Sequence, residues 1–156
     1  MDEQGLAKLY YITLLLYCLS LITVSFSSPS ISGSVWGIAA LLVGWMQTML
    51  ALSIFIQTEE INYLILALPW CGNLFILTNF VLLRKRDNER VCCFLSYAGV
   101  ICTLAFMFQP KVFLGETSRL IDASIDIGSL LWCMSSVLVL YLFYQLQSRG
   151  AFVKLD

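Results

Sequence analysis

Carboxylates are the side chains of this sequence whose spacing most readily suggests chemistry. Asp122 and Asp126 lie four residues apart, so they would share one face if this stretch is helical. Glu116 precedes them, and Glu59 and Glu60 form a second acidic pair upstream. Together these side chains could form an acidic vestibule that attracts cations. The competing interpretation is that Asp122 or Asp126 caps the start of the last helix, where a negative charge is favourable.

A second group of polar residues interrupts an apolar stretch at residues 62–83. Pro69 removes a backbone hydrogen bond and should bend a helix, and Gly72 loosens the same turn. Asn73 follows directly, and Asn79 lies on a different face. Transporters and channels build binding sites from bent helices beside amides. A bundle also bends in this way for packing alone, with the Asn73 amide bonded to a neighbouring helix.

Residue types exclude several classes of site. The chain has no histidine, which excludes haem ligation by histidine, histidine-based zinc sites and Ser-His or Cys-His nucleophilic pairs. Its six cysteines include no C-x-x-C pair, and we interpret them as small apolar residues. No stretch is basic enough to bind nucleic acid. We therefore expect no metal, no cofactor and no catalytic residue, and hence a protein that is not an enzyme.

Membrane-spanning helices are the elements that must position these residues. The chain is 60% hydrophobic and only 12% charged, against roughly 25% charged residues in soluble domains. Crossing the hydrocarbon takes about 20 apolar residues, and the uncharged runs give candidate spans at residues 7–26, 35–56, 62–83, 91–109 and 127–147. We predict an all-α fold, a single polytopic transmembrane helix bundle over residues 1–156 with about five spans. Four spans, with the first or second segment lying at the interface, is the alternative.

Small residues at helical spacing predict where the helices approach one another, because association in lipid depends on close backbone contact. The second span carries Gly37, Ala40 and Gly44 on one stripe. The fourth span carries Ser96 and Gly99 in the same way. We interpret these stripes as seams of a monomeric bundle, with a dedicated oligomer interface as the alternative.

Basic residues indicate the orientation, since Lys and Arg concentrate on the cytoplasmic side of membrane proteins. The most basic loop, residues 84–90, is therefore predicted to be cytoplasmic. With five spans, the N-terminus then lies outside and the C-terminus lies in the cytoplasm. The inner basic residues are Arg84, Lys85, Arg86, Arg90, Arg149 and Lys154, and the outer ones are Lys8, Lys111 and Arg119.

Several short motifs occur in order along the chain. Gly44-Trp45 is followed by the sequence PWCGN at residues 69–73, and Glu116 is followed by Gly128 and Trp132. In these motifs the chain resembles a group of small multi-pass inner-membrane proteins of bacteria. The resemblance implies a bacterial inner-membrane location and no particular reaction. Immunity proteins against pore-forming toxins and membrane subunits of anti-phage systems are similar in size and architecture.

The leading hypothesis is a non-enzymatic inner-membrane protein that acts through a protein partner in or at the membrane. An immunity protein or a membrane subunit of a defence or sensing complex would fit. The alternative is a small homo-oligomeric ion channel or permeation subunit, using the acidic vestibule and the bent third span. The expected partners are the lipid bilayer and another protein or a second copy of this chain, and not nucleic acid.

Overall fold

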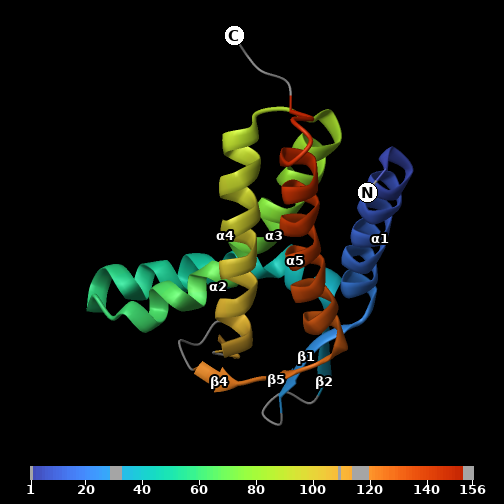
Figure 1. Cartoon of the computed structure of the whole chain (residues 1–156). Coiled ribbons are helices and arrows are strands. Elements are labelled where there is room, and N and C mark those ends of the chain that lie inside the picture. Colours follow the sequence, from blue (N-terminus) through green and yellow to red (C-terminus); the bar gives the residue numbers. More distant parts are fainter. Residues whose placement is uncertain (1, 29–32, 109, 114–119, 153–156) are drawn as a thin grey trace.

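The computed structural model describes residues 2–28, 33–108, 110–113 and 120–152, in which long helices alternate with short strands (Figure 1). The helices are α1 (Glu3–Ile22), α2 (Gly37–Thr58), α3 (Ile61–Lys85), α4 (Glu89–Phe108) and α5 (Ile127–Gln147). The strands are β1 (Val24–Ser28), β2 (Gly33–Trp36), β3 (Lys111–Phe113), β4 (Leu120–Asp122) and β5 (Ser124–Ile125). All five helices are long and apolar enough to cross a membrane, which confirms the predicted all-α bundle of a membrane protein.

Local capping sets the helix ends more finely than hydropathy does. The Asp2 carboxylate accepts a hydrogen bond from the Gly5 amide at 2.9 Å, so α1 begins at Glu3 rather than at the predicted residue 7. At the end of α2, Glu59 adopts the left-handed conformation (φ 57°), and its amide donates to the Phe55 carbonyl at 2.7 Å. Glu59 and Glu60 therefore form a tight turn that reverses the chain between α2 and α3.

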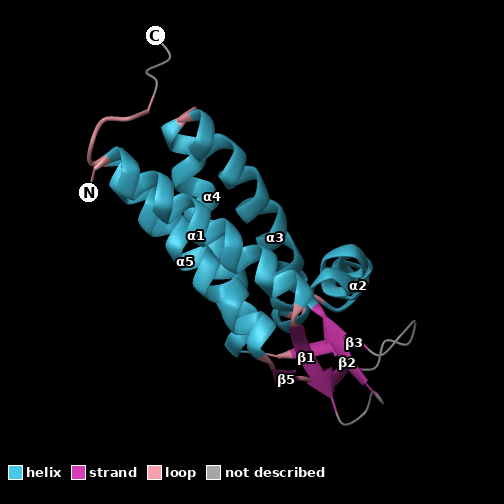
Figure 2. Ribbon diagram, turned by 90° about the vertical axis from the view of Figure 1, so that its right-hand side faces the viewer, coloured by secondary structure: helices cyan, strands magenta, loops and turns pink. Residues whose placement is uncertain are grey.

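Helices α1, α4, α5 and the second half of α3 run side by side as the bundle (Figures 1 and 2). Helix α4 packs along α3 and α5, and α1 packs along α5. The main buried cluster lies between these helices and includes Tyr17, Ile76 and Phe143. The core of the protein is therefore the centre of the bundle, and α2 contributes nothing to this cluster.

The two ends of the bundle differ in structure and in charge. The basic end holds the start of α1, the turn between α3 and α4, and the end of α5 (Figure 1). There, a Glu3 carboxylate oxygen lies 2.6 Å from the Arg86 guanidinium, and the Gln147 amide donates to the Glu89 carboxylate at 2.8 Å. The opposite end, the sheet end, holds all of the described strands (Figure 2).

Two small antiparallel sheets close the sheet end, and the sequence analysis did not predict them. Strand β1 lies between β2 and β5, with Phe26 opposite both Val35 and Ile125. Strand β3 pairs with β4, which places Lys111 opposite Asp122. Each strand has only two to five residues, too short for an alternating pattern to be recognised in the sequence. The pairings satisfy backbone groups that would otherwise lie unpaired in the connections.

Helix α2 lies across the bundle instead of along it. At its first residue, Gly37, the amide donates to the Thr23 carbonyl just after α1, at 3.0 Å. Ten residues later, about 15 Å along a helix, the Gln47 side chain is hydrogen-bonded to Phe113 of β3. Both contacts lie at the sheet end, and Figure 2 shows α2 end-on where the bundle helices are seen along their length. The rest of α2 projects sideways with the start of α3 (Figure 1), and we call residues 37–70 the arm.

Close contact between its two helices holds the arm together. The Trp70 indole N–H donates to the Leu41 carbonyl at 2.8 Å, and the Thr48 hydroxyl donates to the Ala67 carbonyl at 3.2 Å. A Cβ atom placed on Gly44 would lie 2.7 Å from Cδ1 of Trp70, which is closer than a real contact allows. The missing side chain at Gly44 therefore lets the Trp70 ring reach the backbone of α2.

The direction of α2 bears on the predicted placement of the chain ends. Helix α1 runs from the basic end to the sheet end, α3 returns to the basic end, and α4 and α5 make two further passes (Figure 1). The start of α1 and the end of α5 thus lie at the same end, as the Glu3–Arg86 ion pair also requires. We predicted opposite sides of the membrane. Which side of the membrane each terminus faces stays a prediction, because the structure shows only that both lie at one end of the bundle.

We expect single cysteines at Asp2 and Asn88 to lie on one side of the membrane and a cysteine at Asp122 to lie on the other. All three positions are exposed, whereas the native cysteines lie within apolar helices. Labelling by a membrane-impermeant maleimide, in intact cells and in inverted vesicles, measures the side of each position. Opposite labelling of Asp2→Cys and Asn88→Cys would contradict the four-pass arrangement.

A second prediction concerns the packing of the arm. Gly44→Ala should lower the free energy of unfolding by about 1–3 kcal/mol, because the added methyl group overpacks the contact with Trp70. Gly99→Ala is the matched control, since a Cβ there would meet Ile76 at an ordinary 3.5 Å. Its stability should stay unchanged or rise by up to about 1 kcal/mol from helix propensity. Thermal melting in detergent compares the two, and equal shifts would mean that Trp70 does not press on Gly44.

Candidate functional site

Helix α3 changes its packing partner at the predicted bend. Residues before Pro69 face α2, as the bond between Thr48 and Ala67 shows. Beyond the bend, Gly72 is buried, and a Cβ on it would lie 3.1 Å from both Cys102 of α4 and Trp132 of α5. Pro69 and Gly72 therefore mark the point where α3 leaves the arm and enters the bundle.

Asn73 links the bend to α1. Its side-chain oxygen accepts a hydrogen bond from the Tyr17 hydroxyl at 3.1 Å, and Tyr17 is itself only 2% exposed. Asn73 is partly buried and faces a neighbouring helix rather than an open path. This is the geometry of the packing interpretation, in which an intramembrane amide is bonded to the next helix.

Asn79 lies between α3 and α4 and is fully buried. Its amide nitrogen donates to the Ser96 hydroxyl at 2.6 Å and lies 3.4 Å from the Cys92 carbonyl. Among the described residues, its side-chain oxygen has no hydrogen-bond partner. A buried amide that is half satisfied is costly to place, so the fit between Asn79 and Ser96 fixes how α3 and α4 align.

A third polar pair joins α4 to α5 below Asn79. The hydroxyls of Thr103 and Ser136 lie 2.8 Å apart, so one donates to the other, and the accepting hydroxyl donates to a backbone carbonyl one turn earlier. Neither side chain is more than 1% exposed. With Asn73 and Asn79, this pair completes a set of intramembrane polar groups that are bonded to one another across the bundle.

The predicted acidic vestibule is not assembled in the described residues. Glu59 and Glu60 lie at the tip of the arm, whereas Asp122 lies in β4 and Asp126 precedes α5, both at the sheet end. Asp122 and Asp126 do not share a helical face, because the chain between them is β-strand. Glu116 lies outside the described residues.

Asp126 caps α5 through its backbone carbonyl and not through its carboxylate. It occupies the N-cap position of α5, and its carbonyl accepts from the amides of Ser129 and Leu130 at 3.1 and 3.3 Å. Its carboxylate makes no cap hydrogen bond, and one carboxylate oxygen is buried without a partner among the described residues. Asp122 is exposed and accepts from the Ser28 hydroxyl through its carbonyl, at 2.7 Å. Neither carboxylate therefore binds the amides that begin α5.

The small residues of the two predicted stripes lie at different contacts. A Cβ on Gly37 would lie 2.0 Å from the Ser20 carbonyl of α1, so only glycine permits that approach. Ala40 lies on the same helix and is partly buried. Gly44 faces Trp70, and in α4 Ser96 faces Asn79 while Gly99 faces Ile76. These contacts lie within one chain.

Gln47 lies on the predicted packing stripe of the second span, but its hydrogen-bonding role was not predicted. Its side-chain amide donates to the Phe113 carbonyl and accepts from the Phe113 amide, both at 3.2 Å. The one available signal is a lone amide in a span that carries no charge. Its partner could not be inferred, because β3 lies far along the chain and is only three residues long.

Metal ligation finds no support in the described residues, where no three Cys, Asp or Glu side chains gather closely enough to hold an ion. All six cysteines are free. Comparison with protein-family models, with curated proteins and with solved structures found no significant match for this chain.

A double-mutant cycle on Asn79 and Ser96 tests whether the buried pair holds α3 against α4. Asn79→Ala and Ser96→Ala should show a coupling energy of about 0.6–1.7 kcal/mol, the range for hydrogen bonds between membrane helices. Unfolding of the full chain in detergent measures it. Tyr97→Phe with Tyr144→Phe is a comparison cycle at an exposed α4–α5 contact, where we expect weaker coupling. Independent effects of Asn79 and Ser96 would contradict the assignment.

Proposed function

We propose that this protein acts by binding another membrane protein through the arm. The observation that carries the proposal is the arm itself, an apolar hairpin that projects from the bundle and carries two carboxylates at its tip (Figure 1). An apolar surface is stable only against acyl chains or apolar protein, and a carboxylate within the membrane needs a cation or a polar group beside it. The surface of the hairpin and its tip are therefore considered separately.

The surface of α2 has no side that suits water. The helix contains no charged residue, and only a small share of it is buried within the chain. A helix lying in the membrane–water interface needs one polar face and one apolar face. The large exposed side chains of α2 are apolar instead, and at 3.6 residues per turn they form one broad face: Ile38, Leu42, Val43, Trp45, Met46, Met49 and Ile56. This surface is therefore matched to acyl chains or to the apolar surface of another protein.

The tip of the arm has the opposite requirement. Glu59 and Glu60 are exposed, and the one ion pair among the described residues is Glu3–Arg86 at the basic end. Carboxylates at membrane depth are costly, and they are usually paired with a cation or a polar group. A partner that presents Arg or Lys at the level of the tip would supply that pairing while its own helices cover the apolar surface.

The charge distribution supports an orientation for this complex. Lys8 joins the basic end once α1 is placed, so the described basic residues there are Lys8, Arg84, Lys85, Arg86, Arg90 and Arg149. At the sheet end, Lys111 is the one basic residue among those described. Since Lys and Arg favour the cytoplasmic side, we propose that both termini are cytoplasmic. The arm then lies in the outer leaflet of a bacterial inner membrane.

This placement suits the classes of partner that the architecture suggested. An immunity protein must meet a pore-forming toxin within the membrane, and a subunit of a defence or sensing complex must meet its neighbour there. An arm that projects sideways within the membrane could contact a toxin or a neighbouring subunit. The channel alternative receives less support, because the buried polar groups of the bundle are bonded to one another instead of lining a water path.

Photo-crosslinking in native membranes tests the proposal. A photoreactive amino acid at Leu42 or Met49 should crosslink to one discrete protein, because both lie on the arm and are 66% and 58% exposed. Phe94 and Ile101 of α4 are matched controls, with 65% and 59% exposure, and should crosslink only to lipid. Glu59→Gln combined with Glu60→Gln should abolish the crosslink, while Asp87→Asn with Asp122→Asn should preserve it. Crosslinks to lipid alone from both helices would overturn the proposal.

A further inference from the structure

A groove runs between α1 and the second half of α3, starting at the basic end. Helix α1 packs along α5 but reaches α3 chiefly through long side chains, among them the Tyr17–Asn73 and Glu3–Arg86 contacts. Two adjoining cavities fill the gap, of about 180 Å³ and about 590 Å³, and both are lined by Tyr10 and Arg84. The larger volume lies within the range of roughly 300–1,000 Å³ that ligand pockets occupy.

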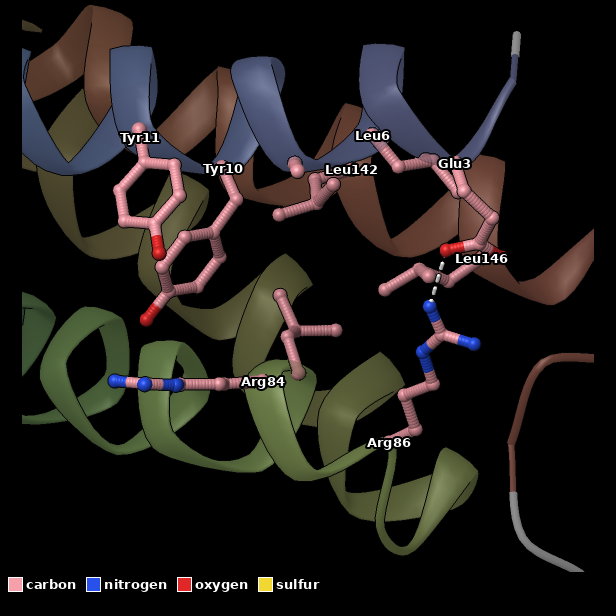
Figure 3. A pocket seen from close by; sticks show the side chains of 10 residues that line it. Glu3, Leu6, Tyr10, Tyr11, Arg84, Arg86, Leu142 and Leu146 are labelled. Carbon is pink, nitrogen blue, oxygen red and sulfur yellow. Dashed lines mark hydrogen bonds and ion pairs between the residues drawn. The ribbon is translucent and has the colours of Figure 1, made fainter.

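The mouth of the groove carries uncompensated positive charge. Arg86 is neutralised by Glu3 at 2.6 Å. Arg84 and Lys85 line the groove as well, and no carboxylate among the described residues pairs with either. Figure 3 shows the hydroxyl of Tyr10 pointing toward the guanidinium of Arg84, with the hydroxyl of Tyr11 on the same side. The Tyr10 hydroxyl donates to the Phe80 carbonyl at 3.4 Å, which leaves Tyr11 as the hydroxyl donor. Cations and hydroxyl donors facing one space are the groups that bind a phosphate.

Below the mouth, the walls of the groove become apolar. The wall from α3 is formed by Leu77, Phe80 and Val81, and α1 contributes Leu14. Leu77 and Val81 lie on the same face of α3 as Arg84, at spacings of four and three residues. Leu77 is seven residues from Arg84, or about 10 Å along the helix. A ligand in this groove therefore meets positive charge at one end and a hydrocarbon surface along the rest of its length.

We propose that this groove binds one anionic phospholipid of the surrounding bilayer. The headgroup phosphate lies at Arg84 and Lys85, on the side of the groove that the Tyr11 hydroxyl faces, and one acyl chain follows the wall of Leu77 and Val81. Basic pockets between membrane helices on the cytoplasmic side bind anionic headgroups in this way. The apolar continuation favours a lipid over free phosphate, and the unpaired cations favour an anionic lipid over a zwitterionic one.

Native mass spectrometry of the purified full chain in detergent tests the proposal with three probes. They are phosphatidylglycerol, phosphatidylcholine with the same acyl chains, and inorganic phosphate. Phosphatidylglycerol should be retained at least five-fold more tightly than phosphatidylcholine. Inorganic phosphate alone should leave the melting temperature unchanged. Equal retention of the two lipids would overturn the proposal, as would stabilisation by phosphate equal to that by phosphatidylglycerol.

Matched variants locate the site. Arg84→Gln with Lys85→Gln should weaken retention of phosphatidylglycerol by about five-fold for each lost cation. Arg90→Gln with Arg149→Gln removes the same charge from the same end outside the groove and should keep wild-type retention. Val81→Trp fills the apolar part of the groove without changing charge, at a position that is 54% exposed, and should also reduce retention. Wild-type retention in the first variant or in Val81→Trp would overturn the site.

Discussion

The hydrogen bonds between Gln47 and the backbone of Phe113 constrain the rest of this structure. The side-chain amide binds both the N–H and the C=O of one residue, as a neighbouring strand would. Leaving those groups unpaired in an apolar setting would cost several kcal/mol. The contact fixes the middle of α2 at the sheet end, so α2 cannot run up the bundle. Helix α3 must then return and bend at Pro69, and the chain makes an even number of lengthwise passes.

The sequence predicted the features that depend on neighbouring residues and missed those that depend on residues far along the chain. Uncharged runs of about 20 residues gave all five helices, since both the run and the helix reflect the need to avoid charge in hydrocarbon. The bend at Pro69 was likewise local, because proline acts on its own turn. The direction of α2 was not local, because it depends on Phe113 and on the end of α1. The same reason hid the sheets, whose strands pair across long stretches of chain.

The candidate site residues could be recognised from the sequence, but the residues that they contact could not. Asn73 and Asn79 could be recognised as unusual because a polar residue in an apolar run is visible on inspection, yet their partners Tyr17 and Ser96 lie on other helices. The acidic residues were predicted to lie together from their charge alone. Glu59 and Asp122 belong to the arm and to the sheet end, which only the fold could separate. The groove at Arg84 had no sequence signal, because it is a space between two helices.

The central position of β1 has a consequence for the order in which the protein is completed. Strands β1 and β2 pair early, but the other edge of β1 is filled by β5. From Trp36 at the end of β2 to Ser124 at the start of β5, synthesis must add 88 residues (124 − 36 = 88). At about 5–20 residues per second, this takes roughly 4–18 seconds. Throughout that interval β1 presents an open strand edge, which can recruit a foreign strand. The closure of the sheet end therefore waits until α4 has been made, and only α5 and the C-terminal residues follow it.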